Sequence, residues 1–173
     1  IGNEWMPIVC LLNQGQVYFH LGFYQRSLHF LEGAYRRLQT LNIAYRTAAC
    51  EKHLAHCWLK LGQFDQAHTY LDKAAAHYKQ AKQNKYLYEV YLLRAETLLQ
   101  VGQTTEAVVF LEKALTIAQA EGAKIETAFC QRLLGETLCR LGEFKQAFQY
   151  LATAESNFAQ MNMNAELASC QVT

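Results

Sequence analysis

The sequence predicts an all-α fold built as an array of stacked helical hairpins. Four glycines recur at a spacing of forty residues: Gly22, Gly62, Gly102 and Gly142. The apolar residues between these marker glycines follow a helical spacing. Hydrophobic residues make up 51% of the chain, and its one proline, Pro7, stands near the start. A fixed period of about 20 to 50 residues is typical of proteins that stack copies of one supersecondary unit. Such arrays usually bind other molecules rather than transform them.

The segment that follows each marker glycine is predicted to be a helix, which we name the B helix. In 104–121 the apolar residues fall at the i, i+3, i+4, i+7 positions of one helix face: Ala107, Phe110, Leu111, Ala114, Leu115 and Ala118. Thr104 or Thr105 is the expected N-cap, and Gly122 the expected left-handed stop, a place that Asn42 and Asn162 occupy in other repeats. We expect B helices near 24–40, 64–81, 104–121 and 144–160.

The segment before each marker glycine is predicted to be the other helix of the hairpin, the A helix, as in 87–101. We expect A helices near 5–21, 45–61, 85–101 and 125–141, and a partial fifth A helix at 165–172. The four repeats then cover 5–41, 45–82, 85–122 and 125–161 within a single solenoid, 1–173. The chain opens on Ile1 and stops within the pattern, so we expect a piece of a longer protein.

Small residues recur where the two helices of each hairpin should cross. On the A helices they are Gly15, Ala55, Ala95 and Gly135, and twelve residues later, on the B helices, they are Ser27, Ala67, Ala107 and Ala147. Little side-chain bulk at a crossing lets two helix backbones approach closely.

On these residues the chain resembles the tetratricopeptide repeat family. The small A-helix residues match the Gly/Ala of the family pattern. The later small–large–small trio is matched by Ser27-Leu31-Ala34, Ala67-Leu71-Ala74, Ala107-Leu111-Ala114 and Ala147-Leu151-Ala154. The resemblance implies a right-handed α-α superhelix of four helical hairpins plus the partial fifth A helix.

The chain departs from the family pattern at several points. The first position reads Leu11, Glu51, Tyr91 and Gln131, the closing proline is absent, and the period is forty instead of the usual 34. Long repeats of this kind look like those in sensor arms of bacterial regulatory ATPases, in bacterial caspase-like proteins and in spindle-orientation adaptors.

The charge of the chain is unevenly distributed although its net value is only +1. Residues 1–86 hold ten Lys/Arg and five Asp/Glu, a balance of +5, and residues 87–173 hold six and ten, a balance of −4. One interpretation is drift among surface residues. The other is a basic end that meets an acidic partner, or head-to-tail stacking of copies through the exposed ends of the array.

The residue types give little support to an enzyme, a cofactor site or a metal site. The glycines are spaced as helix punctuation, not as a phosphate-binding loop, and no serine stands in a recognised nucleophile arrangement. Cys50, His53, His56 and Cys57 have a spacing that three zinc ligands could use. However, Cys10, Cys130 and Cys170 stand in register with Cys50, which favours buried reduced cysteines in a cytoplasmic protein.

The resemblance implies that the A helices line a concave groove, with the fifth, ninth and thirteenth positions of each repeat facing it. Leu12 and Leu92 are apolar members of this set, and the polar candidates for partner binding are Gln16, His20, Lys52, His56, Lys60, Glu96, Gln100, Arg132, Glu136 and Arg140. Lys52, His56 and Lys60 form the most basic stripe, which favours an acidic partner segment. The alternative is a solvated inner wall.

These observations predict a non-enzymatic scaffold that binds a peptide or a partner protein in its groove. The alternative is a ligand-sensing regulatory arm of a larger signalling ATPase, transcription regulator or protease. We expect no nucleic-acid partner, because the inner wall includes Glu96 and Glu136 and no face is strongly basic. We also expect no membrane partner, because no apolar run approaches about 18 residues.

Overall fold

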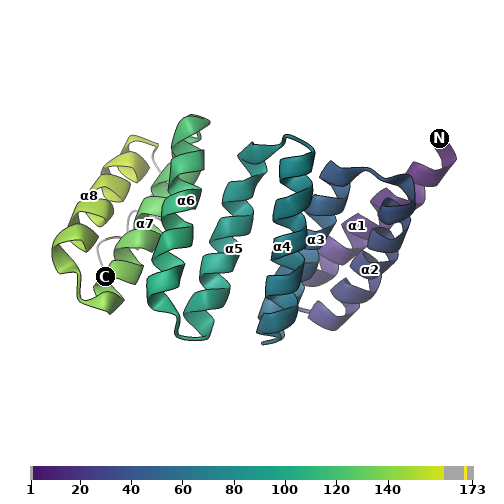
Figure 1. The fold of residues 1–173 in the computed structure, drawn as a ribbon, viewed down its shortest axis with the longest axis horizontal. Coiled ribbons are helices and arrows are strands. Elements are labelled where there is room, and N and C mark those ends of the chain that lie inside the picture. The colour runs from purple at the N-terminus through teal and green to yellow at the C-terminus, as the bar shows by residue number, and fades with distance from the viewer. Residues whose placement is uncertain (1, 162–169, 171–173) are drawn as a thin grey trace. The chain divides into compact units, whose positions relative to one another are not determined.

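This computed structural model describes residues 2–161 and residue 170, with side chains from residue 5 onward. Residues 2–161 form helices that short turns connect. It divides into two compact units, residues 1–84 and 85–173. Each unit holds two helical hairpins, and each is described by itself below (Figure 1).

Unit 1 contains the first two predicted hairpins. α1 (Gly2–His20) pairs with α2 (Tyr24–Leu41), and α3 (Ala44–Lys60) pairs with α4 (Phe64–Gln80). Consecutive helices run antiparallel (Figure 1), and α2 also packs against α3. The A helices of unit 1 are therefore α1 and α3, and its B helices are α2 and α4.

Unit 2 repeats this arrangement. A short 3-10 turn, η1 (Asn84–Tyr86), leads into α5 (Leu87–Gln100), which pairs with α6 (Thr104–Ala120). α7 (Lys124–Leu141) pairs with α8 (Phe144–Gln160), and α6 packs against α7.

The all-α hairpin architecture predicted from the repeat is confirmed, with two differences at helix starts. α1 begins at Gly2, before Pro7, although we expected a start near residue 5. The third A helix begins at Leu87 because residues 84–86 form the 3-10 turn. The predicted helix at 165–172 lies, apart from Cys170, outside the described residues.

The marker glycines end the A helices in the left-handed conformation, with φ between 73° and 81°. At the first of them the Gly22 N–H donates to the Phe19 carbonyl and the Phe23 N–H to the Tyr18 carbonyl, both at 2.9 Å. This pair of bonds satisfies carbonyls that the helix end leaves without partners. A left-handed residue is needed at this position, which explains the forty-residue spacing of glycine.

The first three B helices are each followed by a second left-handed residue, which is glycine only after α6. Gly122 has φ 65° and Asn42 φ 51°, as predicted, and Lys82 has φ 53° at the same register. The prediction of a threonine N-cap is wrong, since Thr104 is already inside α6 and the N-cap is Gln103, whose side chain makes no capping bond. The tight turn at Gly102 makes Gln103 the N-cap residue. Its carbonyl accepts from the Ala107 N–H at 3.1 Å.

The small-residue crossings are buried in all four hairpins, and two of them leave no room for a methyl group. A Cβ added at Gly15 would lie 2.7 Å from Cγ of Leu31, and one added at Gly135 would lie 2.5 Å from Cγ of Leu151. Close approach of the A and B helices therefore depends on these two glycines.

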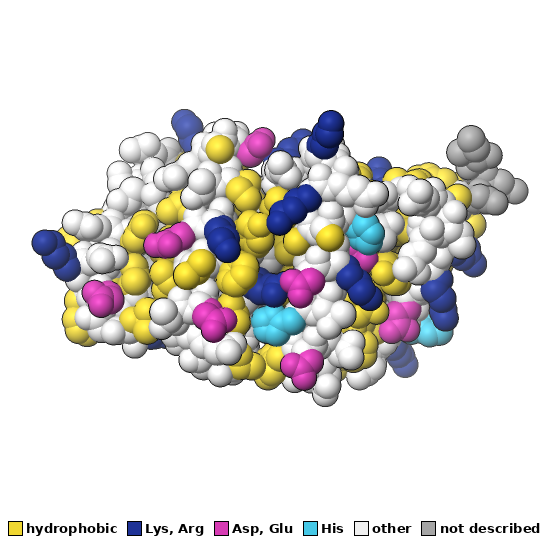
Figure 2. All heavy atoms as spheres, viewed as in Figure 1, with side chains coloured by type: hydrophobic (Ala, Val, Ile, Leu, Met, Phe, Trp, Pro, Cys, Tyr) yellow, Lys and Arg dark blue, Asp and Glu magenta, His cyan; other side chains and the backbone are white. Residues whose placement is uncertain are grey.

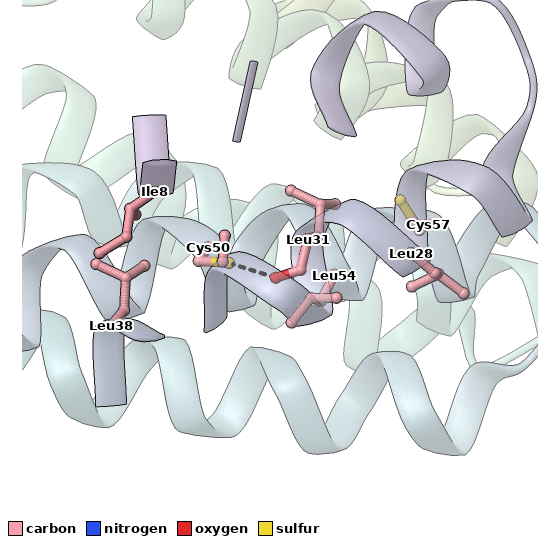
Figure 3. Packing of buried hydrophobic residues seen from close by; sticks show 8 residues of the cluster. Ile8, Leu28, Leu31, Leu38, Cys50, Leu54 and Cys57 are labelled. Carbon is pink, nitrogen blue, oxygen red and sulfur yellow. Dashed lines mark hydrogen bonds between the residues drawn. The ribbon is translucent and has the colours of Figure 1, made fainter. Parts of the chain in front are cut away.

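The core of unit 1 lies between α1, α2 and α3 and consists mainly of aliphatic side chains and cysteines (Figure 3). The buried members are Ile8, Leu28, Leu31, Ala34, Leu38, Cys50, Leu54 and Cys57. Cys50 Sγ points at the Leu31 carbonyl at 3.4 Å, so it packs on the neighbouring hairpin. An equivalent cluster in unit 2 includes Leu98, Leu111, Cys130 and Leu134.

Candidate partner-binding site

A pocket of about 200 Å³ opens between the two A helices of unit 1. α1 contributes three side chains, α3 contributes two, and α2 contributes one. The lining residues are Gln16, Phe19, His20, Leu31, His53 and His56. Three of the predicted groove residues, Gln16, His20 and His56, are thus brought together, because the i+4 spacing on each A helix turns them toward the same side.

The polar wall of this pocket is built on a contact between α1 and α3. Nε2 of Gln16 lies 3.2 Å from Nε2 of His53. An amide nitrogen can only donate, so Nε2 of His53 is the acceptor in this contact. Gln16 and His53 therefore position each other across the two helices.

Apart from Leu31, the rest of the wall is aromatic. The rings of Phe19 and His56 lie 4.3 Å apart between centroids at an interplanar angle of 46°. His20 meets Phe19 edge-on at 5.8 Å. Aromatic contacts of this kind hold side-chain rings in place, so the pocket has an ordered hydrophobic wall beside its imidazole and amide groups.

The two predicted lysines of unit 1 do not line the pocket. Lys52 is half-buried and Lys60 is exposed, and both lie on α3 one turn from His56. The basic stripe therefore runs past the pocket along α3.

Of the predicted polar groove residues of unit 2, two pair with each other, two are exposed and one is half-buried. Arg132 and Glu136 form an i, i+4 ion pair on α7, and the guanidinium of Arg132 lies 5.7 Å from the centroid of the Phe129 ring. Gln100 and Arg140 are exposed, and Glu96 is half-buried. Because Arg132 and Glu136 neutralise each other, this stripe carries less charge for a partner than the separate residues suggested.

The family comparison decides the identity of the repeat. The tetratricopeptide repeat profile matches residues 7–80 and 86–160. The chain belongs to the tetratricopeptide repeat family. The two matched ranges cover the helices of both units, so the resemblance stated from the sequence is confirmed.

Solved structures share this tetratricopeptide repeat fold. BtubC (BKLC) from P. vanneervenii matches with a TM-score of 0.81 and 20% identity, over 90% of this chain and 64% of that one. Aspartyl phosphate phosphatase F from Bacillus subtilis matches with a TM-score of 0.84 and 18% identity, over 97% of this chain and 44% of that one. The Rap conjugation gene regulator of plasmid pLS20, solved in complex with the Phr* peptide, matches with a TM-score of 0.75 and 19% identity, over 89% of this chain and 43% of that one.

At these identities the likeness shows a shared fold. The chain spans less than two thirds of the length of each of these three proteins. No curated protein matches it by sequence.

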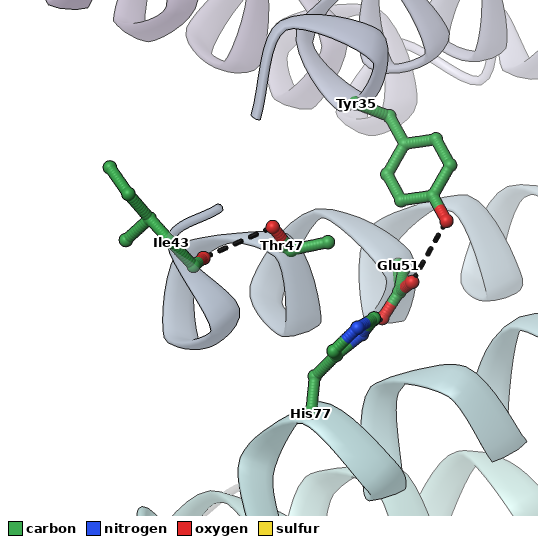
Figure 4. A network of polar contacts seen from close by, with 5 residues as sticks. All are labelled: Tyr35, Ile43, Thr47, Glu51 and His77. Atoms are coloured by element: carbon green, nitrogen blue, oxygen red, sulfur yellow. Dashed lines mark hydrogen bonds and ion pairs between the residues drawn. The ribbon is translucent and has the colours of Figure 1, made fainter. Parts of the chain in front are cut away.

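In hairpin 2, which α3 and α4 form, the first position of the tetratricopeptide repeat pattern is Glu51. This residue belongs to a buried polar network that was not predicted from the sequence (Figure 4). Glu51 is fully buried on α3. Its carboxylate accepts from the Tyr35 hydroxyl at 3.0 Å and lies 2.7 Å from Nδ1 of His77. Burial raises the pKa of Glu51, and the contacts with His77 and Tyr35 oppose that shift. Glu51 therefore joins α2, α3 and α4.

Hairpin 4, which α7 and α8 form, has an uncharged counterpart of this network. Gln131 stands eighty residues after Glu51 and Asn157 eighty after His77. Nδ2 of Asn157 donates to Oε1 of Gln131 at 2.9 Å. The signal in the sequence was the departure from the family pattern at Glu51 and Gln131, matched by a second polar residue on the B helix of the same hairpin.

The six cysteines are free thiols, but one prediction about them is wrong. Cys10 is exposed, although Cys50, Cys130 and Cys170 at the same register are buried. Cys50, by contrast, is covered by α2, because its Sγ lies 3.4 Å from the Leu31 carbonyl. Burial raises the pKa of Cys57 to about 11 and that of Cys130 to about 12, so both are thiols at neutral pH.

The zinc spacing considered at the sequence level does not form a site in the described residues. Cys57 Sγ lies 3.2 Å from the Ser27 hydroxyl, and Cys50 faces the Leu31 carbonyl. Across the residues with described positions, no three His, Cys, Asp or Glu side chains are placed to hold a metal ion.

The described surface mixes charges of both signs. On the face drawn in Figure 2, basic and acidic side chains are interspersed with hydrophobic ones. Of the helices described, none has the length and apolar character that a bilayer span requires.

Proposed function

We propose that this chain is a non-enzymatic protein-interaction module that binds a peptide or a segment of a partner protein on its A-helix faces. The observation that carries the proposal is the pocket between α1 and α3, since it gathers three predicted groove residues. A small concave site with an apolar wall and a few polar groups is the usual form of a recognition pocket. The peptide-bound regulator of plasmid pLS20, which shares the fold, supports a peptide as the ligand class.

The partner segment that fits unit 1 best is acidic. Lys52 and Lys60 flank the pocket on α3, and residues 1–86 carry a balance of +5. Charge of this kind speeds encounter with an anionic partner and is screened over about 8 Å at physiological ionic strength.

The second candidate is the regulatory-arm function, in which the module senses a peptide and switches an attached domain. The likeness to a peptide-bound gene regulator favours it. The six free thiols support work in a reducing compartment such as the cytoplasm. In either case we infer that residues 1–173 form a single tetratricopeptide repeat domain.

Binding of acidic peptides to the folded chain tests the proposal. Fluorescence anisotropy with a labelled hexaglutamate peptide should show saturable binding, and Lys52→Glu with Lys60→Glu should weaken it roughly tenfold, more at low salt than at high. The matched control is Arg36→Glu with Lys79→Glu, which changes the same charge at exposed positions of the B helices. Equal weakening in both double variants would show only a general charge effect, and no binding to any peptide would refute the module.

A further inference from the structure

We infer that a second pocket of unit 1, formed by α1 and the start of α2, binds the phosphorylated tyrosine side chain of a partner protein. This pocket has a volume of about 350 Å³ and is lined by Tyr18, Gln25, Arg26, His29 and Phe30. It shares no lining residue with the pocket between α1 and α3. The inference therefore goes beyond the proposed function, because it assigns a separate site with a different ligand.

The first argument is the way in which the structure holds Arg26. Its guanidinium carbon lies 5.8 Å from the centroid of the Tyr18 ring and 5.6 Å from that of the Phe23 ring, within the roughly 6 Å reach of a cation–π contact. Among the described side chains, none is a carboxylate paired with Arg26. Its N–H groups therefore remain available to an anion, which a guanidinium binds through two parallel hydrogen bonds.

The second argument is the donor set of the pocket. Gln25, Arg26 and His29 supply amide, guanidinium and imidazole N–H groups, and none of the five lining residues is acidic. The first turn of α2 also holds no acidic residue, and its N-cap makes no side-chain capping bond. The positive end of the helix dipole favours an anion there. A phosphate group, with three acceptor oxygens and a charge of about −2, uses this donor set more fully than a carboxylate does.

The third argument is the aromatic wall beside these donors. The rings of Tyr18 and Phe30 are stacked, with centroids 5.2 Å apart and an angle of 2° between their planes. His29 meets Phe30 edge-on at 5.4 Å. The pocket volume of about 350 Å³ is roughly twelve times the 30 Å³ share of one water molecule in the liquid, which leaves room for a phenyl ring with its phosphate. The wall therefore favours phosphotyrosine over phosphoserine, which has no ring to pack against it.

The fourth argument is that the arginine is confined to hairpin 1, which α1 and α2 form. At the register of Arg26 the other B helices carry Gln66, Glu106 and Gln146. Three hairpins thus fold without a basic residue at this position, so the packing of the repeat does not require one. This leaves ligand binding as a reason for the stacked arginine in hairpin 1.

The test uses the intact chain and three labelled pentapeptides with blocked ends, Gly-Ser-X-Ser-Gly, in which X is phosphotyrosine, tyrosine or phosphoserine. Fluorescence anisotropy should show saturable binding of the phosphotyrosine peptide and roughly tenfold weaker binding of each of the other two. Equal binding of the tyrosine peptide would overturn the role of the phosphate, and equal binding of the phosphoserine peptide would overturn the role of the ring. No binding of the phosphotyrosine peptide would overturn the site.

Arg26→Gln should weaken binding of the phosphotyrosine peptide roughly tenfold. The variant should fold, because α4 and α8 carry Gln66 and Gln146 at this register. Arg26→Lys should also weaken binding, since lysine keeps the charge but lacks the planar pair of donors. The matched control is Arg36→Gln, which removes the same charge at an exposed position of α2 and should leave binding unchanged. Equal weakening by Arg26→Gln and Arg36→Gln would show a general charge effect and overturn the site.

Tyr18→Leu tests the aromatic wall separately. This variant should also fold, because α5 and α7 carry Leu98 and Leu138 at the same register. It should lower the affinity for the phosphotyrosine peptide toward that for the phosphoserine peptide, and an unchanged preference between the two would overturn the role of the wall.

The site and the proposed function can fail independently. Lys52→Glu with Lys60→Glu, the variant that tests the proposed function, should keep the preference for phosphotyrosine over tyrosine. Loss of that preference in the double variant would attribute phosphate binding to α3 and overturn the site. Hexaglutamate binding without phosphotyrosine binding in the parent chain would overturn the site and leave the interaction module standing.

Discussion

Oε2 of Glu51 and Nδ1 of His77 lie 2.7 Å apart, and the carboxylate that makes this contact is fully buried (Figure 4). Burial is the largest influence on Glu51 and raises its pKa above the ordinary 4.5. The folded state therefore favours the protonated acid relative to the unfolded state. Its contribution to stability is fully present below about pH 4.5 and is lost as the pH rises through the raised pKa.

We predict that Glu51→Gln removes the loss of stability that the parent chain suffers as the pH rises through the raised pKa of Glu51. A glutamine keeps an acceptor for the Tyr35 hydroxyl and gains a donor for a neutral His77, so the variant should fold. Its free energy of unfolding, measured in urea from about pH 5 to about pH 8, should rise relative to that of the parent as the pH increases. A constant difference across this range would contradict the prediction.

The uncharged pair of hairpin 4 supplies the matched control for this experiment. Asn157 donates to Gln131 at 2.9 Å at the equivalent positions. Glu51→Gln combined with His77→Asn places the same two residue types in hairpin 2. This double variant should show no pH dependence from the network, because neither group titrates.

A methyl group at Gly135 should be strongly destabilising. The added Cβ would lie 2.5 Å from Cγ of Leu151 and 3.1 Å from the Ala147 carbonyl, so side chain and backbone must shift. We expect Gly135→Ala to cost about 1–3 kcal/mol in the free energy of unfolding, as overpacking usually does.

Gly33→Ala is the control for that prediction, because the nearest atom to its added Cβ is 3.6 Å away, an ordinary contact. This glycine is inside α2, where alanine is the better helix former. The variant should be more stable by about 0.5–1 kcal/mol. Urea unfolding of the two variants checks both signs, and similar losses in both would show that the Gly135 crossing is not specially tight.

The left-handed backbone at Lys82 should be strained, and replacement of Lys82 by glycine should relieve this strain. Its φ of 53° is unfavourable for a side chain with a Cβ, and Gly122 adopts φ 65° at the equivalent place in the next repeat. We expect Lys82→Gly to raise the melting temperature slightly and Gly122→Ala to lower stability by roughly 1 kcal/mol. Thermal unfolding of the two exchanges should shift in opposite directions, and a lower melting temperature for Lys82→Gly would contradict the argument.

Most helix bounds could be predicted from the sequence because their signals are local. The left-handed glycine at the end of each A helix and the i, i+3, i+4 spacing need no knowledge of distant residues. Lys82 escaped prediction because lysine gives no sign of a left-handed conformation. Its neighbours in register, Asn42 and Gly122, were the only indication.

The candidate site could be predicted only in part. Gln16, His20 and His56 were predicted because the family resemblance places the fifth, ninth and thirteenth positions of each repeat in the groove, and these positions recur at i+4 along one helix face. Phe19 and His53 were missed as pocket residues because the pocket depends on how α1 crosses α3, which no spacing within one helix encodes. In the same way, the partner of Glu51 stands 26 residues away on another helix. Arg132 and Glu136 lay on the predicted stripe, but they bind each other.

The exposed aromatic face of α8 gives the last prediction. Phe144 and Phe148 are 70% and 74% exposed, although Leu28, at the position of Phe148 in the first repeat, is only 3% exposed. Leu28 belongs to the core cluster that includes Cys57 of α3, so in unit 1 this position is covered by the next A helix. The equivalent face of α8 therefore presents apolar surface suited to another helix.

We expect this face to make copies of the chain associate as concentration rises. Phe144→Lys with Phe148→Lys should keep the helical content, since both side chains are exposed, and should remove the concentration dependence of the sedimentation coefficient. Val109→Lys is the control, because Val109 is 45% exposed on α6 of the same unit and adds the same kind of charge elsewhere. Persistent association in the double phenylalanine variant would exclude this face as the contact. Equal dispersal by Val109→Lys would attribute the effect to net charge, because added positive charge repels copies wherever it lies.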